Sequence, residues 1–211
     1  MDDIQSATSR RQPLTVLLVF VVFAVHGFVP VPDVNETHYL AKAKHYWDAS
    51  YCPGDFFLDS ADAHLAFYWT IGWITRLVSL PAAAWIGRVA AWLWLAWCWQ
   101  RLSAALYLAG RESTLAALLF VAGIAHANFA GEWVVGGVEA KCFAYGFVLL
   151  GLAAMADNRW RAMGVHFGAA SAWHVLVGGW ALLGGLFVWS AQTGSRRNSL
   201  PELAQGMALG G

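Results

Sequence analysis

Long apolar runs separated by short polar stretches dominate the pattern of the chain. A transmembrane helix needs about 20 mostly apolar residues. The pattern predicts such helices over residues 13–31, 82–100, 115–131 and 140–156. A further apolar stretch, 162–191, is too long for one crossing and short for two. We expect it to form a tight helical hairpin, the alternative being one crossing followed by a re-entrant turn.

Composition agrees with this pattern. Hydrophobic residues make up 59% of the chain and charged residues 12%, whereas globular chains are about a quarter charged. The 13 tryptophans point the same way, because Trp and Tyr are enriched at membrane interfaces. The net charge is zero, which gives no indication of nucleic-acid binding. The sequence therefore predicts an all-α, polytopic transmembrane bundle in contact with membrane lipids.

The charges between the apolar runs predict one orientation. Residues 1–12 contain two arginines, and we expect them to be cytoplasmic, because short cytoplasmic loops carry an excess of Lys and Arg. The acidic first loop, 32–81, then lies on the extracytoplasmic face of the plasma (inner) membrane. A double crossing of 162–191 would place Arg196 and Arg197 inside, which favours the hairpin. The first run could be a signal peptide, but it lacks an A-x-A-like cleavage site. We therefore interpret it as an uncleaved transmembrane span.

The loop 32–81 predicts two helices that lie along the membrane surface. In the first, Leu40 and Trp47 share an apolar face, while Lys42 belongs to the opposite, polar face. After a Pro-Gly turn, residues 62–80 predict a second, aromatic-rich helix, which we interpret as interfacial rather than spanning.

Asp33 and Glu36 form the first candidate site. One interpretation is structural, with Asp33 as an N-cap and Glu36 as its partner in a capping box. The other is catalytic, because Glu36 falls on the apolar face of its helix, where a carboxylate is costly unless paired or used. A carboxylate held in this way can accept the proton of a hydroxyl nucleophile. The pattern leaves both interpretations open.

The polar residues between the third and fourth runs form a second candidate site. Glu132, Glu139 and Lys141 lie there, and Gly136 and Gly137 would let the backbone approach a ligand closely. One interpretation is an ordinary loop. The other is that Lys141 neutralises a phosphate while a glutamate orients a substrate.

Polar residues inside the apolar runs raise further hypotheses. Arg88 and His174 are costly in lipid and are expected to face a partner or a cavity. Haem held by two histidines is disfavoured, because His126 and His166 fall at opposite ends of their spans. No inverted repeat supports a transporter. The three cysteines have no C-x-x-C spacing, and we predict no metal site from the pattern.

Several short motifs occur in a distinctive order. Residues 35–43 read NETHYLAKA, close to D-E-x-x-Y-x-x-x-A, and residues 64–69 read HLAFYW, which retains the His and aromatics of an H-P-P-L-x-Y motif without its prolines. Arg88 follows near the start of the second run. An E-x-K-x-x-x-Y pattern comes before and within the fourth, formed by Glu139, Lys141 and Tyr145.

This order resembles the GT-C superfamily of membrane glycosyltransferases, in the branch of the protein O-mannosyltransferases and lipid A aminoarabinose transferases. The resemblance implies transfer of a sugar from a polyprenyl-phosphate-linked donor to an acceptor hydroxyl on the extracytoplasmic face. It implies Glu36 or Asp33 as the base, and Lys141, Arg88 or His174 as the group that stabilises the leaving phosphate. It also implies that His64, Glu132, Glu139 and Tyr145 contribute to substrate binding.

The chain also departs from this family. Asn35 stands where the family commonly has Asp, which leaves open which carboxylate is the base. Some relatives use a divalent metal and others do not, so the cofactor is also open. The family usually has more spans, so we interpret 192–211 as a loop leading to a missing part of the polypeptide. The alternative functions are a non-catalytic membrane scaffold fragment and a transporter.

Overall fold

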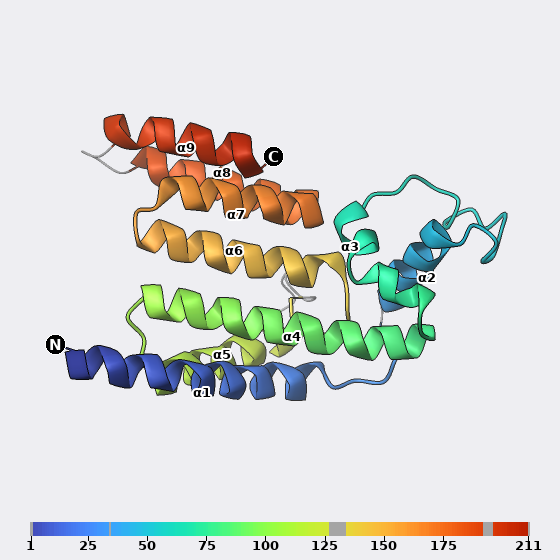
Figure 1. The fold of residues 1–211 in the computed structure, drawn as a ribbon, viewed down its shortest axis with the longest axis horizontal. Helices are drawn as coiled ribbons and strands as arrows, with labels where there is room; N and C mark the ends of the chain where they lie inside the picture. The colour runs from blue at the N-terminus through green and yellow to red at the C-terminus, as the bar shows by residue number, and fades with distance from the viewer. Residues whose placement is uncertain (1, 34, 127–133, 192–195, 211) are drawn as a thin grey trace.

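A computed structural model describes residues 2–33, 35–126, 134–191 and 196–210. The described residues form helices and contain no strand, which confirms the prediction of an all-α fold. The longer helices lie side by side (Figure 1). They are α1 (Asp2–Gly27), α4 (Leu80–Ala105), α5 (Gly110–His126), α6 (Ala140–Ala156), α7 (Trp160–Trp173), α8 (Val175–Ala191) and α9 (Arg196–Gly210).

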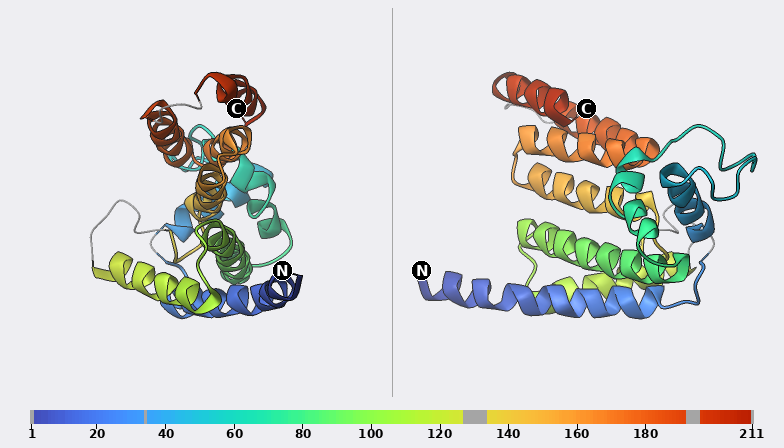
Figure 2. Two further views of the ribbon diagram at one scale, coloured as in Figure 1. Left: turned by 90° about the vertical axis from the view of Figure 1, so that its left-hand side faces the viewer. Right: turned by 45° about the vertical axis from the view of Figure 1, so that its right-hand side comes forward.

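The long helices form one layer with additional helices at its two edges. Figure 2 shows α1, α4, α6 and α7 stacked in sequence, with α5 beside α1 and with α8 and α9 beside α7. Glycines allow the closest approaches within this layer. A Cβ added at Gly146 of α6 would lie 1.9 Å from Nε1 of Trp94 on α4, so only glycine permits this packing.

The apolar runs 82–100 and 140–156 lie within α4 and α6, and 162–191 contains most of α7 and all of α8, which meet at His174. The first run, 13–31, extends beyond the end of α1 at Gly27, and residues 127–131 of the third run lie outside the described residues. Among the residues that the structure describes, no helix is both long enough and apolar enough to cross a membrane. The predicted crossings therefore stay a prediction.

Three short helices gather at one end of the layer, where the loop 32–81 folds over it (Figure 1). They are α2 (Glu36–Trp47), α3 (Leu65–Trp69) and the 3₁₀ helix η1 (Gly72–Arg76). The single helix predicted over 62–80 is wrong, because the chain breaks at Thr70 between α3 and η1. The Thr70 hydroxyl donates to the carbonyl of Ala66, and Gly72 then brings η1 against Ala43 of α2.

The polar face predicted for α2 is wrong at Lys42. This side chain is 4% exposed, because the loop after α2 folds back over it. Its ammonium donates to the carbonyl oxygens of Leu58 and Ser60, each at 2.5 Å, and lies 3.4 Å from a carboxylate oxygen of Asp62. A buried ammonium is tolerable only with such partners.

The loop interpretation of 192–211 is also wrong, because residues 196–210 form α9, which packs against α7. A Cβ added at Gly206 would lie 2.3 Å from the carbonyl oxygen of Arg161, so the two helices touch backbone to backbone. Leu203 joins Trp160, Met163 and Phe167 in a small core between α9 and α7.

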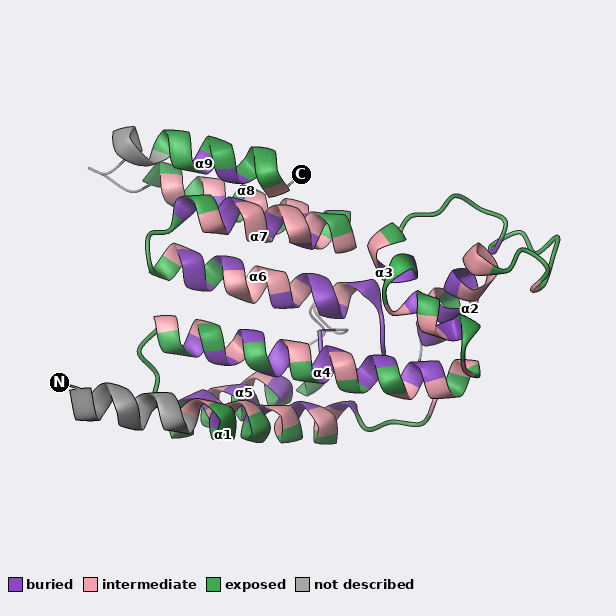
Figure 3. Cartoon of the chain, in the orientation of Figure 1, coloured by how far each residue is buried: buried purple, intermediate pink, exposed green. Residues whose placement is uncertain are grey.

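The main core lies between α1, α4, α5, α6 and the three short helices, and includes Phe23, Phe67, Trp92 and Val138. Large apolar side chains are also exposed along the long helices, as the distribution of exposed positions in Figure 3 illustrates. Examples are Val25 at 73%, Leu119 at 65%, Trp180 at 71% and Phe187 at 72% exposed.

Candidate functional site

A buried ion pair between Glu36 and Arg88 joins α2 to α4. Nε of Arg88 donates to Oε1 of Glu36 at 2.6 Å, and Nη2 donates to Oε2 at 2.7 Å. Arg88 is 0% exposed and Glu36 is 1% exposed. Such a bidentate contact combines charge with fixed geometry. The two charges that the sequence placed in costly apolar positions therefore compensate each other.

Two backbone groups complete the contacts of the Glu36 carboxylate. The amide of Val138 donates to Oε1 at 2.8 Å, and the amide of Asp33 donates to Oε2 at 2.8 Å. Together with Arg88 they make four hydrogen bonds, which is the acceptor capacity of a carboxylate. Glu36 thus retains no acceptor position for the proton of an attacking hydroxyl.

The remaining donors of Arg88 hold the segment that follows α1. Nη1 donates to the carbonyl of Val29 at 2.5 Å, and Nη2 is 3.3 Å from the carbonyl of Pro30. The Trp85 ring lies 4.8 Å below the guanidinium. Arg88 therefore acts as the anchor that fixes this connection, and its charge is already neutralised by Glu36.

Asp33 stands beside this anchor. Glu36 accepts from the Asp33 amide, as a capping box requires, but the N-cap residue of α2 is Asn35, whose side chain makes no capping hydrogen bond. Oδ2 of Asp33 accepts from the amide of Gly137 at 3.1 Å. Gly137 is required there, since an added Cβ would lie 2.8 Å from Cβ of Asp33. Asp33 is half-buried, which makes it the more accessible carboxylate of the pair.

Glu139 extends the cluster toward α6. It is 2% exposed and stands at the N-cap of that helix, and its Oε1 lies 3.4 Å from Nδ2 of Asn35. Tyr39 lies close enough to Glu139 for the carboxylate charge to affect its hydroxyl. Burial, and then the Glu139 charge, raise the pKa of the Tyr39 hydroxyl well above its ordinary value. Tyr39 is consequently a neutral hydrogen-bonding group at physiological pH.

His64, His174 and Lys141 form the other side of the cluster. The rings of His64 and His174 are stacked with centroids 5.4 Å apart, and the Tyr39 ring lies 4.9 Å from His64. Burial lowers the pKa of His64, and the nearby Lys141 charge lowers it further. Nδ1 of His64 is buried without a hydrogen-bond partner among the described residues. His64 is therefore a neutral imidazole at neutral pH.

A groove of about 330 Å³ opens beside His64. Its walls come from α2, from the loop after it and from α3, and include Tyr39, Phe57, His64 and Tyr68. Such a mostly apolar, aromatic groove with a few polar groups is typical of small-molecule sites.

Most of the residues singled out from the sequence thus meet at one end of the bundle, although they come from four separate segments. Tyr145 lies further along α6 and packs against the main core. Glu132 lies outside the described residues. The backbone amides of Gly137 and Val138 and the ring of Tyr39 were not identified as contributors. The sequence indicated these contributors only through the glycine pair, for the amides, and through the tyrosine of the NETHYLAKA segment, for the ring.

The cluster contains no group of three metal-ligating side chains among the residues that the structure describes. Comparisons with protein-family models, with curated proteins and with solved structures find no match to this chain.

Proposed function

We propose that this chain is a membrane glycosyltransferase of the GT-C type, or the N-terminal part of one. It transfers a sugar from a polyprenyl-phosphate-linked donor to an acceptor hydroxyl on the extracytoplasmic face. The observation that carries the proposal is the convergence of Asp33, Glu36, Arg88, Glu139 and Lys141 at one end of the bundle. These residues come from the segments that resemble the family.

The geometry favours Asp33 over Glu36 as the base. Asp33 takes the proton of the acceptor hydroxyl while the oxygen attacks the anomeric carbon. The bond between that carbon and the phosphate oxygen breaks, and the phosphate leaves with the electron pair. Lys141 stabilises the charge that develops on the leaving group. Glu36 and Arg88 act as positioning residues, since they neutralise each other and form hydrogen bonds with each other and with the backbone around Asp33.

The membrane part of the proposal is supported by the exposed apolar side chains of the long helices and by the charge pattern of the sequence. The connections between α4 and α5 and between α6 and α7 lie at the end of the bundle opposite to α2 and α3 (Figure 1). These connections and their flanks carry Arg101, Arg111, Arg159 and Arg161. This separation of basic and acidic ends supports a cytoplasmic N-terminus.

An assay of sugar transfer by the full-length gene product tests the proposal. Polyprenyl-phosphate-linked sugars are offered as donors, and Asp33→Asn is compared with the wild type. Asn can still accept the Gly137 amide, so the fold is retained while the proton acceptor is lost. We expect turnover to fall by about 10²–10⁴-fold, the usual contribution of general base catalysis. Wild-type turnover in Asp33→Asn would remove it as the base, and absence of transfer from every donor would overturn the function.

A further inference from the structure

The loop that follows α2, residues 48–64, folds back over that helix and is held by two of its side chains. Lys42 and His45 are three residues apart, so they are neighbours on one face of α2. The Lys42 ammonium contacts the loop between residues 58 and 62. The His45 ring contacts the loop at two further residues. One of the two attachments is therefore a permanent cation and the other is a group that can gain or lose a proton near neutral pH.

Both ring nitrogens of His45 face acceptors. Nδ1 lies 2.8 Å from the carbonyl oxygen of Tyr51, and Nε2 lies 3.0 Å from Oδ1 of Asp59. A carbonyl oxygen and an ionised carboxylate can only accept, so a neutral imidazole, which has a single N–H, would direct a lone pair at one of them. Only the imidazolium presents a proton to both. The His45 side chain is 12% exposed, so the ring is largely withdrawn from water that could replace a lost partner.

Charged groups of α2 and of the loop surround this ring. Asp59 faces it from the loop. Hydrogen bonds from Ser50 lower the pKa of the Asp48 carboxyl, and the charges of Lys44 and His45 lower it further, which places Asp48 within electrostatic reach of the imidazole. His45 lies in the last turn of α2, where the helix dipole favours a cation, whereas the adjacent Lys44 opposes one.

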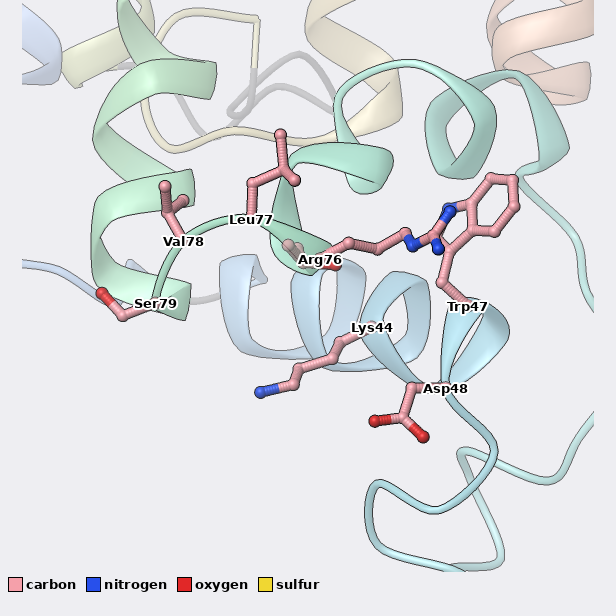
Figure 4. Close-up of a pocket in the computed structure, with 8 residues that line it drawn as sticks. Lys44, Trp47, Asp48, Arg76, Leu77, Val78 and Ser79 are labelled. Carbon is pink, nitrogen blue, oxygen red and sulfur yellow. The ribbon is translucent and has the colours of Figure 1, made fainter.

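The other helices packed against α2 bring two arginines. Arg76 of η1 reaches across to the Trp47 ring, with its guanidinium 5.4 Å from the ring centroid (Figure 4). Arg88 of α4 is neutralised in its ion pair at the opposite end of α2, and α3 has no charged side chain. Among these charged groups of the described residues, only Asp59 forms an ion pair with the His45 ring. The contact therefore depends on the charges of these two side chains.

The turn that carries Asp59 also forms one wall of the groove of about 330 Å³. Oδ1 of Asp55 accepts from the amides of Phe57 and Leu58, each at 2.9 Å, which makes this segment one compact turn. Phe57 lines the groove directly. A displacement of Asp59 consequently moves this wall of the groove.

We propose that His45 is a pH-sensitive clasp for the loop. As an imidazolium it binds both the Tyr51 carbonyl and the Asp59 carboxylate, and it holds the groove wall against α2. When the ring gives up a proton to water, one of the two contacts becomes repulsive and the turn that carries Asp59 is released, while Lys42 still holds the loop. Histidine changes its charge between about pH 5 and 8, so the wall is closed at the acidic end of this range and released at the alkaline end.

Hydrogen–deuterium exchange of the whole chain in a neutral detergent, at about pH 5.5 and about pH 8, tests this inference. Protection factors, which correct for the effect of pH on the intrinsic exchange rate, are compared for the amides of residues 55–60 and for those of α4. His45→Gln removes the titrating ring. Asp59→Asn keeps the contact in both forms of the ring, because its amide can accept from the imidazolium and donate to the neutral imidazole.

His38→Gln is the matched control. This histidine lies on the same helix, and its ring lies 5.4 Å from that of Phe57, but it forms no ion pair among the described residues. Circular dichroism establishes that each variant keeps its helices.

In the wild type we expect protection of the loop amides to fall by about three- to fivefold from the lower to the higher pH, as the loss of a partly exposed ion pair predicts, while α4 is unchanged. The fall should be absent in His45→Gln and Asp59→Asn and retained in His38→Gln. The proposal is overturned if wild-type protection is equal at both pH values or if α4 falls by the same factor. It is equally overturned if Asp59→Asn or His45→Gln shows the wild-type fall, or if His38→Gln abolishes it. None of these outcomes depends on sugar transfer, so the two proposals fail separately.

Discussion

At the scale of single residues, the role of Glu36 is determined by the four hydrogen-bond donors around its carboxylate rather than by its place in a motif. Its carboxylate receives two bonds from Arg88 and two from backbone amides. Removing one member of a buried ion pair leaves the other charged and uncompensated. If Glu36 only completed a capping box, its side chain would contribute far less to the free energy of unfolding.

Replacing Glu36 with Gln separates these two roles. The amide nitrogen of Gln would face N–H donors, and Arg88 would be left buried without a counter-charge. We expect the free energy of unfolding to fall by about 3–5 kcal/mol, measured by denaturant titration in detergent.

Glu112→Gln provides the matched control. Glu112 accepts the amide of Ala109 at 2.7 Å at the start of α5, which is the same local bond without an arginine. Since Gln also forms this bond, the control should change stability by only about 0.3–1 kcal/mol, the usual effect of a charge at a helix end. If Glu36→Gln changed the free energy of unfolding by an equally small amount, Glu36 would serve only as a helix cap.

At the scale of helices and turns, the contact between α2 and η1 depends on a missing side chain. A Cβ added at Gly72 would lie 2.6 Å from Cβ of Ala43 and 3.2 Å from the carbonyl oxygen of Phe67. Neither neighbour can rotate away, because one is an alanine and the other is backbone. The missing side chain therefore lets η1 pack closely against α2.

Gly72→Ala should therefore lower the free energy of unfolding by about 1–3 kcal/mol, the usual cost of an extra methyl group in a tightly packed site. Gly123→Ala in α5 is the matched control, because an added Cβ there meets nothing within 4 Å. That control should instead stabilise the protein by about 0.5–1 kcal/mol, because alanine favours the helix. Thermal unfolding of both variants measures the difference, and equal shifts of the same sign would contradict the packing role of Gly72.

At the scale of the whole molecule, the long helices carry their polar connections to two opposite ends (Figure 1). The loop after α2, which contains Asp55, lies at the end that carries the candidate site. Asp157, at the C-cap of α6, lies at the other end. If lipid surrounds the exposed apolar side chains between these ends, the two residues face opposite sides of a membrane.

Single cysteines at the two positions test this arrangement in a chain whose Cys52, Cys98 and Cys142 have been replaced. An impermeant thiol reagent added to intact cells should label Asp55→Cys at once and Asp157→Cys only after permeabilisation. Both carboxylates are exposed, so burial does not limit the reaction. Ala49→Cys, in the same loop as Asp55, should repeat its result. Equal labelling of the two ends in intact cells would exclude the proposed orientation.

The sequence by itself determined the helical class and the placement of most helices, because apolar runs and their breaks act locally along the chain. It also identified Glu36 and Arg88 as charges in costly positions. Only the tertiary structure decided that they pair, since 52 residues separate them and their contact requires α2 to pack on α4. Likewise, Lys42 is buried because the loop that follows α2 folds back and supplies its acceptors. A local pattern indicates which groups need a partner, whereas packing determines which partner each one meets.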